Sequence, residues 1–129
     1  MMIDFFIPMI PPTKTAQEKK ISMRNGKPFI YEPQELKNAR QKFLDNLAKH
    51  KPEKRFNGAV ELLVKWCFLD KKRNGEWKTT RPDTDNLQKM FKDCMTKTGF
   101  WDDDAQVCRE IVEKFWAEVP GIYVRVSEL

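Results

Sequence analysis

The sequence predicts an α+β fold, a mixed β-sheet with two main helices, in a single small domain that spans residues 1–129. Three observations favour this fold. Short apolar segments rich in β-branched and aromatic residues, typical of strands, occur near both ends of the chain and in its middle. Two longer stretches repeat apolar residues with the period of an α-helix. Hydrophobic residues make up 40% of the chain and aromatic residues 12%, which is enough for a buried core.

The first part of the chain is expected to hold a strand, a hairpin and a helix. Residues 2–8 (MIDFFIP) are apolar and aromatic, and prolines follow them, as expected for a strand that runs into a loop. In residues 21–31, two apolar segments flank Asn25-Gly26, a preferred pair for a two-residue hairpin turn. Residues 32–50 are expected to form a helix. Its apolar positions are Leu36, Ala39, Phe43, Leu44 and Leu47.

The middle of the chain is expected to hold a central strand and a second helix. Residues 59–70 (AVELLVKWCFLD) are rich in β-branched and aromatic side chains, which predicts a strand in the centre of the sheet. A basic loop, residues 71–82, separates this strand from residues 84–99, which have a helical period. An Asp or Thr side chain can cap the start of the helix, and Gly99 ends it. The apolar stripe of the helix consists of Leu87, Met90, Phe91, Cys94 and Met95.

The last part of the chain has one indecisive pattern and one clear one. Residues 105–118 (AQVCREIVEKFWAE) fit a helix or a strand equally well. Residues 121–129 (GIYVRVSEL) alternate apolar and polar side chains, as a strand does. We find no internal repeat or interdomain linker, in agreement with a single domain.

Several classes of protein are disfavoured by composition. No apolar run approaches the roughly 20 residues that span a bilayer, and the first residues lack the basic leader of a secretory signal, so a cytoplasmic protein is expected. Cys67, Cys94 and Cys108 are widely spaced, which predicts reduced thiols rather than zinc ligands. His50 is the only histidine and lies in a lysine-rich segment, which disfavours Ser-His-Asp and Cys-His catalysis.

Charge is distributed unevenly along the chain, whose net charge is +5. Residues 1–82 carry 18 Lys and Arg against 9 Asp and Glu, a balance of +9. Residues 83–129 carry 6 against 10, a balance of −4. A basic front and an acidic back suit a polyanionic ligand whose reactive group is held by metal ions.

Carboxylates gather on both sides of the second predicted helix. Asp83 and Asp85 stand where a loop meets the start of the helix, so both side chains can converge on one point. The triplet Asp102–Asp104 follows the helix, and the glycine between them allows the chain to reverse toward the helix start. Three carboxylates about 5 Å apart repel by about 3 kcal/mol per pair at an effective dielectric near 20. A bound cation would relieve that repulsion.

The chemistry predicted for this cluster is metal-dependent phosphoryl transfer or hydrolysis. Oxygen ligands favour Mg²⁺ or Mn²⁺ over zinc, and such ions stabilise the in-line attack of water on a phosphodiester. Lys89 lies one helical turn after Asp85, where its ammonium could offset the charge on the phosphoryl oxygens or orient the water. A polar stripe of Asn86, Lys89 and Asp93 is expected to border the site.

The stretch RPDTDNLQKMFKDCM…GFWDDDAQV, within residues 81–107, resembles the signature of the RusA family of Holliday-junction resolvases (crossover junction endodeoxyribonucleases), which are common in phages and prophages. The shared features are a D-x-D-N-L-x-K core, an Asp further along the helix, and a D-D-x-Q-V segment about twenty residues on. The resemblance is close over residues 80–108 and general elsewhere. It implies a RusA-like homodimer that binds four-way DNA junctions and cuts two strands symmetrically with Mg²⁺ or Mn²⁺, in DNA recombination and repair.

The resemblance also assigns roles to residues. The catalytic residues that it implies are Asp83, Asp85, Lys89 and Asp104, of which the three aspartates would bind the metal. Asp103 is the neighbouring acid and a further candidate metal ligand. Asp102 has no counterpart in the family pattern, so the choice of ligand within the triplet is left open.

The basic loop of residues 71–82 lies immediately before the acidic motif and is the predicted DNA-binding segment. Its candidates for phosphate contacts are Lys71, Lys72, Arg73, Lys78 and Arg81. Trp77, Phe100 and Trp101 flank the acidic residues. They are either core or dimer-interface residues or platforms on which unpaired bases stack.

Two other functions fit parts of the pattern. A junction- or DNA-binding protein without catalytic activity would use the basic half, but it would have no use for Lys89 beside the acidic cluster. A metal-dependent phosphohydrolase of a small phosphate compound would leave the +9 balance of residues 1–82 without a purpose.

Overall fold

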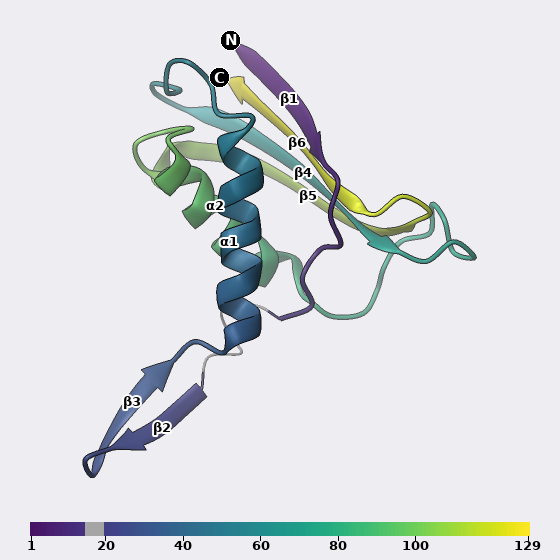
Figure 1. The fold of residues 1–129 in the computed structure, drawn as a ribbon. Helices are drawn as coiled ribbons and strands as arrows, with labels where there is room; N and C mark the ends of the chain where they lie inside the picture. Colours follow the sequence, from purple (N-terminus) through teal and green to yellow (C-terminus); the bar gives the residue numbers. More distant parts are fainter. Residues whose placement is uncertain (15–19) are drawn as a thin grey trace.

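A four-stranded mixed sheet with two helices forms the main body of the protein in a computed structural model, which describes residues 1–14 and 20–129 (Figure 1). The strand order is β1-β6-β4-β5. β4 (Val60–Leu69) pairs in parallel with β5 (Val107–Ala117) and antiparallel with β6 (Gly121–Glu128), which in turn pairs antiparallel with β1 (Met2–Ile7). The predicted α+β class is therefore confirmed, and β4 has a neighbouring strand on each side, as predicted for a central strand.

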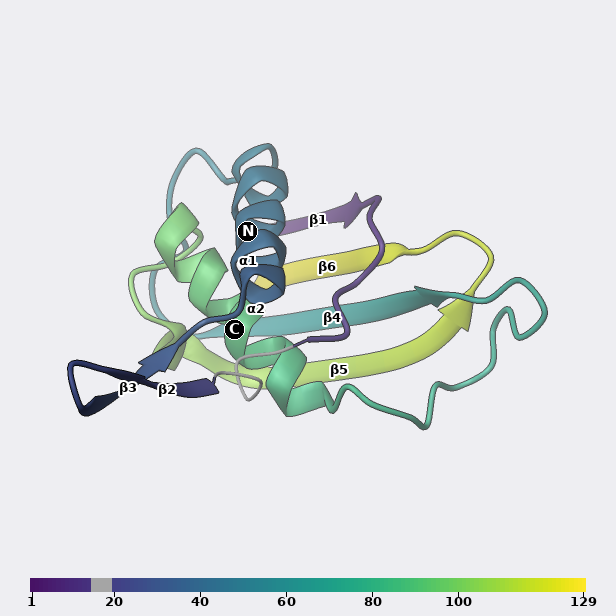
Figure 2. The ribbon, with the colours of Figure 1, turned by 60° about the horizontal axis from the view of Figure 1, so that its bottom comes forward.

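The two helices, α1 (Gln34–Ala48) and α2 (Thr84–Thr98), lie next to each other against the same face of the sheet (Figure 2). Trp66 on β4, Phe43 on α1 and Phe91 on α2 meet in the core, with ring centroids between 5.1 and 5.8 Å apart. Edge-to-face contacts of this kind are favourable for aromatic side chains. The core therefore forms between the sheet and both helices, as their apolar stripes predict.

Both helices begin and end within two residues of the predicted positions. On α1, Leu44 is only partly buried, whereas the other predicted apolar positions are buried. α2 ends at Gly99, whose φ of 102° lies in the left-handed region that favours glycine. Asp83 occupies the N-cap position of α2, but its side chain makes no capping hydrogen bond, unlike the predicted cap. Within the described residues, no helix is long and apolar enough to cross a membrane.

The segment with the indecisive pattern is mostly a strand. A short 3-10 helix, η2 (Asp104–Gln106), leads directly into β5. β5 pairs with β4 along one side, whereas on its other side a loop pairs with it only near its end, through a bridge between Trp77 and Phe115. Most of its side chains are exposed or half-buried. An edge strand of this kind tolerates polar residues on both faces, which removes the period of two from the sequence.

The predicted hairpin is confirmed as β2 (Lys20–Arg24) and β3 (Lys27–Tyr31). Its turn residues Asn25 and Gly26 have φ values of 52° and 75°. Two consecutive left-handed residues are what a two-residue type I′ turn requires. The hairpin projects from the main body beside the start of α1 (Figure 1).

The three cysteines are free thiols. Cys67 and Cys94 are buried, whereas Cys108 is exposed on β5. Burial raises the pKa of the Cys67 thiol and raises the pKa of the Cys94 thiol to about 11. Two of the thiols are therefore held in the neutral form at physiological pH, as expected for core residues.

Candidate active site

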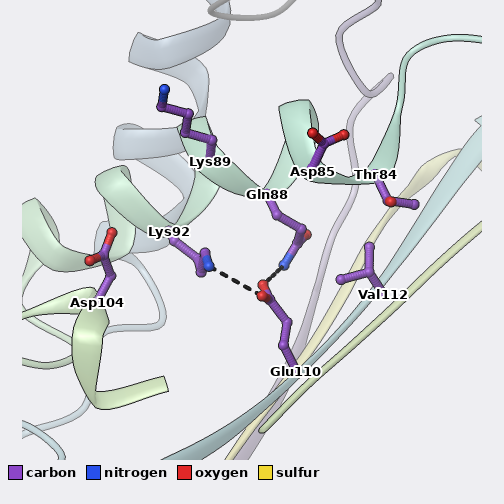
Figure 3. A pocket seen from close by; sticks show the side chains of 8 residues that line it. All are labelled: Thr84, Asp85, Gln88, Lys89, Lys92, Asp104, Glu110 and Val112. Atoms are coloured by element: carbon purple, nitrogen blue, oxygen red, sulfur yellow. Dashed lines mark hydrogen bonds and ion pairs between the residues drawn. The ribbon is translucent and has the colours of Figure 1, made fainter. Parts of the chain in front are cut away.

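A pocket of about 430 Å³ lies between α2 and β5, with η2 at its border (Figure 3). Asp85 and Lys89 from α2 and Asp104 from η2 line it, and all three were predicted as site residues. The other lining residues are Thr84, Gln88, Lys92, Glu110 and Val112. Residues of α2 and residues that follow it in the sequence therefore line one pocket.

The side chains that α2 contributes follow from helical spacing. Asp85, Lys89 and Lys92 lie at positions i, i+4 and i+7, which share one face of a helix. Asp85 is in the first turn of α2, where the positive end of the helix dipole stabilises a carboxylate. Lys92 points toward Glu110, whereas Lys89 points away from it (Figure 3). The pocket thus holds two ammonium groups that face different directions.

Asp104 is positioned by the hydrogen bonds of Gln106. The side-chain N–H of Gln106 donates to the carbonyl oxygens of Phe56 and Gly58, both at 3.0 Å. Its side-chain oxygen accepts from the backbone N–H groups of the two residues before Asp104, at 2.9 and 3.2 Å. These bonds attach η2 to the loop before β4 and fix the backbone at Asp104.

The acids of the triplet Asp102–Asp104 have different surroundings. Asp102 forms an ion pair with Arg55 at 2.8 Å. The side chain of Asp103 accepts a hydrogen bond at 2.9 Å from the backbone N–H of Ala105 and caps η2. Asp104 is the member of the triplet that lines the pocket. The spacing of an Asp and a Gln three residues apart is a capping-box signal, which the sequence contains.

Lys78 was predicted to contact DNA phosphates, but the structure buries it, with only 7% of the residue exposed. Its ammonium donates hydrogen bonds to the carbonyl and hydroxyl oxygens of Thr80, at 3.3 and 2.6 Å, and to the carbonyl oxygen of Arg81. It also lies over the rings of Phe68 and Trp116, 5.0 and 4.6 Å from their centroids. Burial lowers the pKa of Lys78. The buried Lys78 ammonium therefore fixes the loop of residues 71–82 through the oxygens of Thr80 and Arg81.

Lys114 holds the same segment from β5. Its ammonium donates to the carbonyl oxygens of Thr80 and Pro82, at 2.7 and 2.6 Å. Together with Lys78, it fixes the backbone immediately before Asp83. Asp83 itself lies at the N-cap of α2 and is not among the residues that line the pocket.

The other members of the predicted DNA-binding loop are on the surface. The exposed candidates for phosphate contacts are Lys71, Lys72, Arg73 and Arg81. Trp77 is 65% exposed in the same loop, so it is not a core residue, and its two other roles, dimer-interface contact and base stacking, stay predictions. Phe100 and Trp101 are fully buried in the core, so they do not stack on bases.

Five of the lining residues are not predicted from the sequence, and three of them, Gln88, Lys92 and Glu110, are bonded to one another. The Trp66 indole N–H donates to the Gln88 side-chain oxygen at 2.7 Å, and the Gln88 amide donates to Glu110 at 2.7 Å. Lys92 donates to the other oxygen of Glu110 at 3.1 Å. Lys92 could have been found from its i+7 spacing to Asp85. Glu110 gave no signal, because the pattern around it was indecisive.

The predicted polar border of the site is only partly found. Lys89 lines the pocket, whereas Asn86 and Asp93 do not. Asp93 instead forms ion pairs with Arg40 of α1 and with Lys97, both at 3.3 Å. Asp93 therefore attaches α2 to α1 and does not border the pocket.

The pocket offers the donor type of Mg²⁺ and Mn²⁺, because Asp85, Asp104 and Glu110 supply carboxylate oxygens. However, residues 1–14 and 20–129 contain no group of three or more Asp, Glu, His or Cys placed to hold a metal ion. Glu110 is also bonded to Lys92 and Gln88. The residues therefore fit a hard divalent cation by chemistry, but one copy of the described chain does not supply three converging ligands.

Comparisons with known proteins agree with the resemblance seen in the motif. The family model of endodeoxyribonuclease RusA matches residues 9–127. The chain is 32% identical over 133 residues to the crossover junction endodeoxyribonuclease rusA of Lactococcus phage r1t, and the match covers all of both chains. It is 31% identical over 121 residues to the uncharacterized protein YqaN of Bacillus subtilis (strain 168), and this match covers 84% of each chain.

Proposed function

Because the chain belongs to the RusA endodeoxyribonuclease family, we propose that it resolves four-way (Holliday) DNA junctions by symmetric hydrolysis of phosphodiester bonds. The observation that carries this proposal is that Asp85, Lys89 and Asp104 line one pocket. The family motif assigns these residues to the reaction, and they come from two elements, α2 and η2. The name of the phage relative, a crossover junction endodeoxyribonuclease, supports the same substrate.

The proposed cofactor is Mg²⁺, with Mn²⁺ as the alternative, and the proposed ligands are Asp83, Asp85 and Asp104, with Asp103 as the neighbouring acid. When bound, the ion would supply a Lewis acid for the phosphoryl oxygens and lower the pKa of an attacking water. Magnesium is usually bound by one or two carboxylates, with substrate phosphates and waters completing its shell. A pocket with two aspartates that have no partner among the described residues, and with room for a phosphate, is therefore consistent with this cofactor.

The protein's own cations would bind the DNA. Lys89 is exposed at the pocket and would donate to the oxygens of the scissile phosphate, where negative charge grows during the reaction. The exposed residues of the loop before α2 would bind backbone phosphates beside the cut. These residues are Lys71, Lys72, Arg73 and Arg81.

The whole chain, residues 1–129, is proposed to act as one endonuclease domain and to function as a homodimer. A junction has approximate two-fold symmetry, so two copies related by a two-fold axis would place one active site on each of two strands. A role in DNA recombination and repair follows from that substrate.

A cutting assay tests the proposal. Synthetic four-way junctions, forks and plain duplexes are incubated with the protein in Mg²⁺ or in EDTA. We expect paired, symmetric nicks in the junction, weaker cutting of the fork and duplex, and no cutting in EDTA. The Asp85→Asn variant should bind the junction as the wild type does and cut it about 100-fold more slowly or less. Junctions left intact in both Mg²⁺ and Mn²⁺ would contradict the proposal.

A junction-binding protein without catalytic activity is the second candidate. The absence of a three-ligand metal group within the described residues favours it. It predicts salt-dependent junction binding with no nicking under any metal condition. The same assay therefore separates the two candidates.

A further inference from the structure

We propose that Lys92 is a second phosphate-binding residue of the pocket and that Glu110 is the positioning residue that holds it. This inference rests on the proposed function, because it assigns further residues to the same DNA-binding pocket. Lys92 lies within the quoted motif but is not one of its shared positions, and Glu110 lies outside the motif. Both line the pocket together with Asp85, Lys89 and Asp104 (Figure 3).

A chain of hydrogen bonds from the core fixes the carboxylate of Glu110. Trp66 is fully buried, and its indole N–H donates to Gln88, which is only 3% exposed. The Gln88 amide N–H then donates to one oxygen of Glu110 at 2.7 Å. A buried amide is stable only when both its donor and its acceptor are bonded, so this arrangement has a single orientation. It holds the second oxygen of Glu110 toward Lys92.

Lys92 is held in the pocket by that second oxygen, at 3.1 Å. An ammonium has three N–H donors, and Glu110 accepts one of them within the described residues. The other donors are available to a ligand in the pocket. A lysine that is already immobilised loses little side-chain entropy when it binds a phosphate, which is the general advantage of preorganisation.

Lys92 also makes the pocket less negative. Asp85, Asp104 and Glu110 carry −3 in total, and Lys89 and Lys92 carry +2. A pocket of net charge −1 repels a DNA phosphate less than one of charge −2, which is what remains without Lys92. Lys92 would therefore act on substrate phosphate directly, whereas Glu110 would act through Lys92.

A second lysine–glutamate pair on β5 provides a matched control. Glu113 lies three residues after Glu110, on the opposite face of the strand, and pairs with Lys65 of β4 at 3.7 Å. The side chains of Lys65 and Glu113 are 41% and 31% exposed, against 23% and 28% for Lys92 and Glu110. Neither Lys65 nor Glu113 lines the pocket.

The experiment measures junction binding in EDTA as a function of salt, and junction cutting in Mg²⁺. The pocket variants are Lys92→Met, Glu110→Gln and the double variant, and the control variants are Lys65→Met and Glu113→Gln. For Lys92→Met we expect junction cutting to fall about 10- to 100-fold and the slope of log K against log salt to become shallower by about 0.9. Glu110→Gln should lower cutting by a smaller factor and leave the salt slope unchanged. The control variants should change neither quantity.

The double variant separates a phosphate contact from a simple charge effect. We expect it to bind and cut as Lys92→Met does, because Glu110 would act only through the lysine. Wild-type behaviour in the double variant would show that Lys92 only neutralises Glu110, and it would overturn the inference. A double variant weaker than Lys92→Met would overturn the positioning role of Glu110. A salt slope unaffected by Lys92→Met would overturn the phosphate contact.

Failure of the proposed nuclease function and failure of the role proposed for Lys92 give different results. A wild-type protein that binds junctions but never cuts them would contradict the nuclease proposal, and the salt slopes in EDTA would still decide the role of Lys92. A wild-type protein that cuts, with equal effects of Lys92→Met and Lys65→Met, would contradict this inference alone.

Discussion

The two acidic segments that flank α2 are held in place by different means. At the start of α2, the carboxylates of Asp83 at the N-cap and Asp85 in the first turn have no hydrogen-bond or ion-pair partner in the described part of the chain. The backbone that precedes them is fixed instead by the ammonium groups of Lys78 and Lys114. The two lysines therefore stabilise the first segment, and the carboxylates of Asp83 and Asp85 do not contribute to holding it in the described part of the chain.

After α2, the acids themselves stabilise the segment. Asp102 pairs with Arg55, and Asp103 caps η2, so only Asp104 is directed to the pocket. The difference shows that a count of acids in the sequence overestimates the number available to a metal. Within residues 1–14 and 20–129, two of the five aspartates in these segments have structural partners, and three do not.

The largest expected effect concerns the first segment. Asp83→Asn and Asp85→Asn should each lower the rate of junction cutting by about 100-fold or more, because each removes a negative charge from the proposed metal site. Their free energy of unfolding should stay within about 0.5 kcal/mol of the wild type, since neither side chain has a structural bond. Single-turnover cutting and urea unfolding would check both parts. Normal cutting by either variant would remove that aspartate from the site.

The next largest effect concerns Lys78, whose ammonium fixes the backbone before Asp83. Lys78→Met should lower the free energy of unfolding by about 1–3 kcal/mol, because the carbonyl oxygens that it bonds lose their donor. It should also slow junction cutting, since the start of α2 would be less well fixed. Lys71→Met removes an exposed lysine of the same loop and should leave the free energy of unfolding unchanged. Equal unfolding curves for the two variants would contradict the role assigned to Lys78.

A smaller effect distinguishes a cap from a metal ligand at Asp103. Asparagine caps helices about as well as aspartate, whereas alanine loses about 1 kcal/mol. If Asp103 acts as a cap, Asp103→Asn should cut junctions as the wild type does, and Asp103→Ala should be less stable and slower. Loss of cutting in Asp103→Asn at unchanged stability would instead identify Asp103 as a ligand.

The smallest expected effect is the response of stability to metal. Mg²⁺ at a concentration equal to its Kd should stabilise the wild type by about 0.4 kcal/mol. Asp85→Asn should lose this gain, and Asp102→Asn should keep it, because Asp102 is paired with Arg55. Thermal unfolding with and without Mg²⁺ would measure the shift. Superimposed wild-type curves at millimolar Mg²⁺ would argue against a metal site in the free protein.

Much of the fold could be predicted because local patterns agree with the packing. The stripes of α1 and α2, the Asn25-Gly26 turn and the apolar run of β4 are all visible in short windows of sequence. β5 could not be assigned, because an edge strand with partly exposed faces has no clear period. In the site, Asp85, Lys89 and Asp104 were predicted, and the structure brings them to one pocket.

The rest of the site depends on contacts between distant residues. Lys78 looks like any other lysine of a basic loop, and its burial follows from the rings of Phe68 and Trp116, which two strands bring over it. Glu110 is placed through Gln88, 22 residues earlier in the chain. No local pattern contains such pairings. The cap at Asp103 is the exception, since its spacing to Gln106 is readable in the sequence.

The most direct test of this account compares Asp104→Asn with Asp102→Asn in single-turnover cutting of a four-way junction in Mg²⁺. The two substitutions make the same chemical change two positions apart, once in the pocket and once in an exposed ion pair. We expect Asp104→Asn to bind the junction without cutting it, and Asp102→Asn to cut at nearly the wild-type rate. Equal rates for the two variants would contradict the role assigned to Asp104.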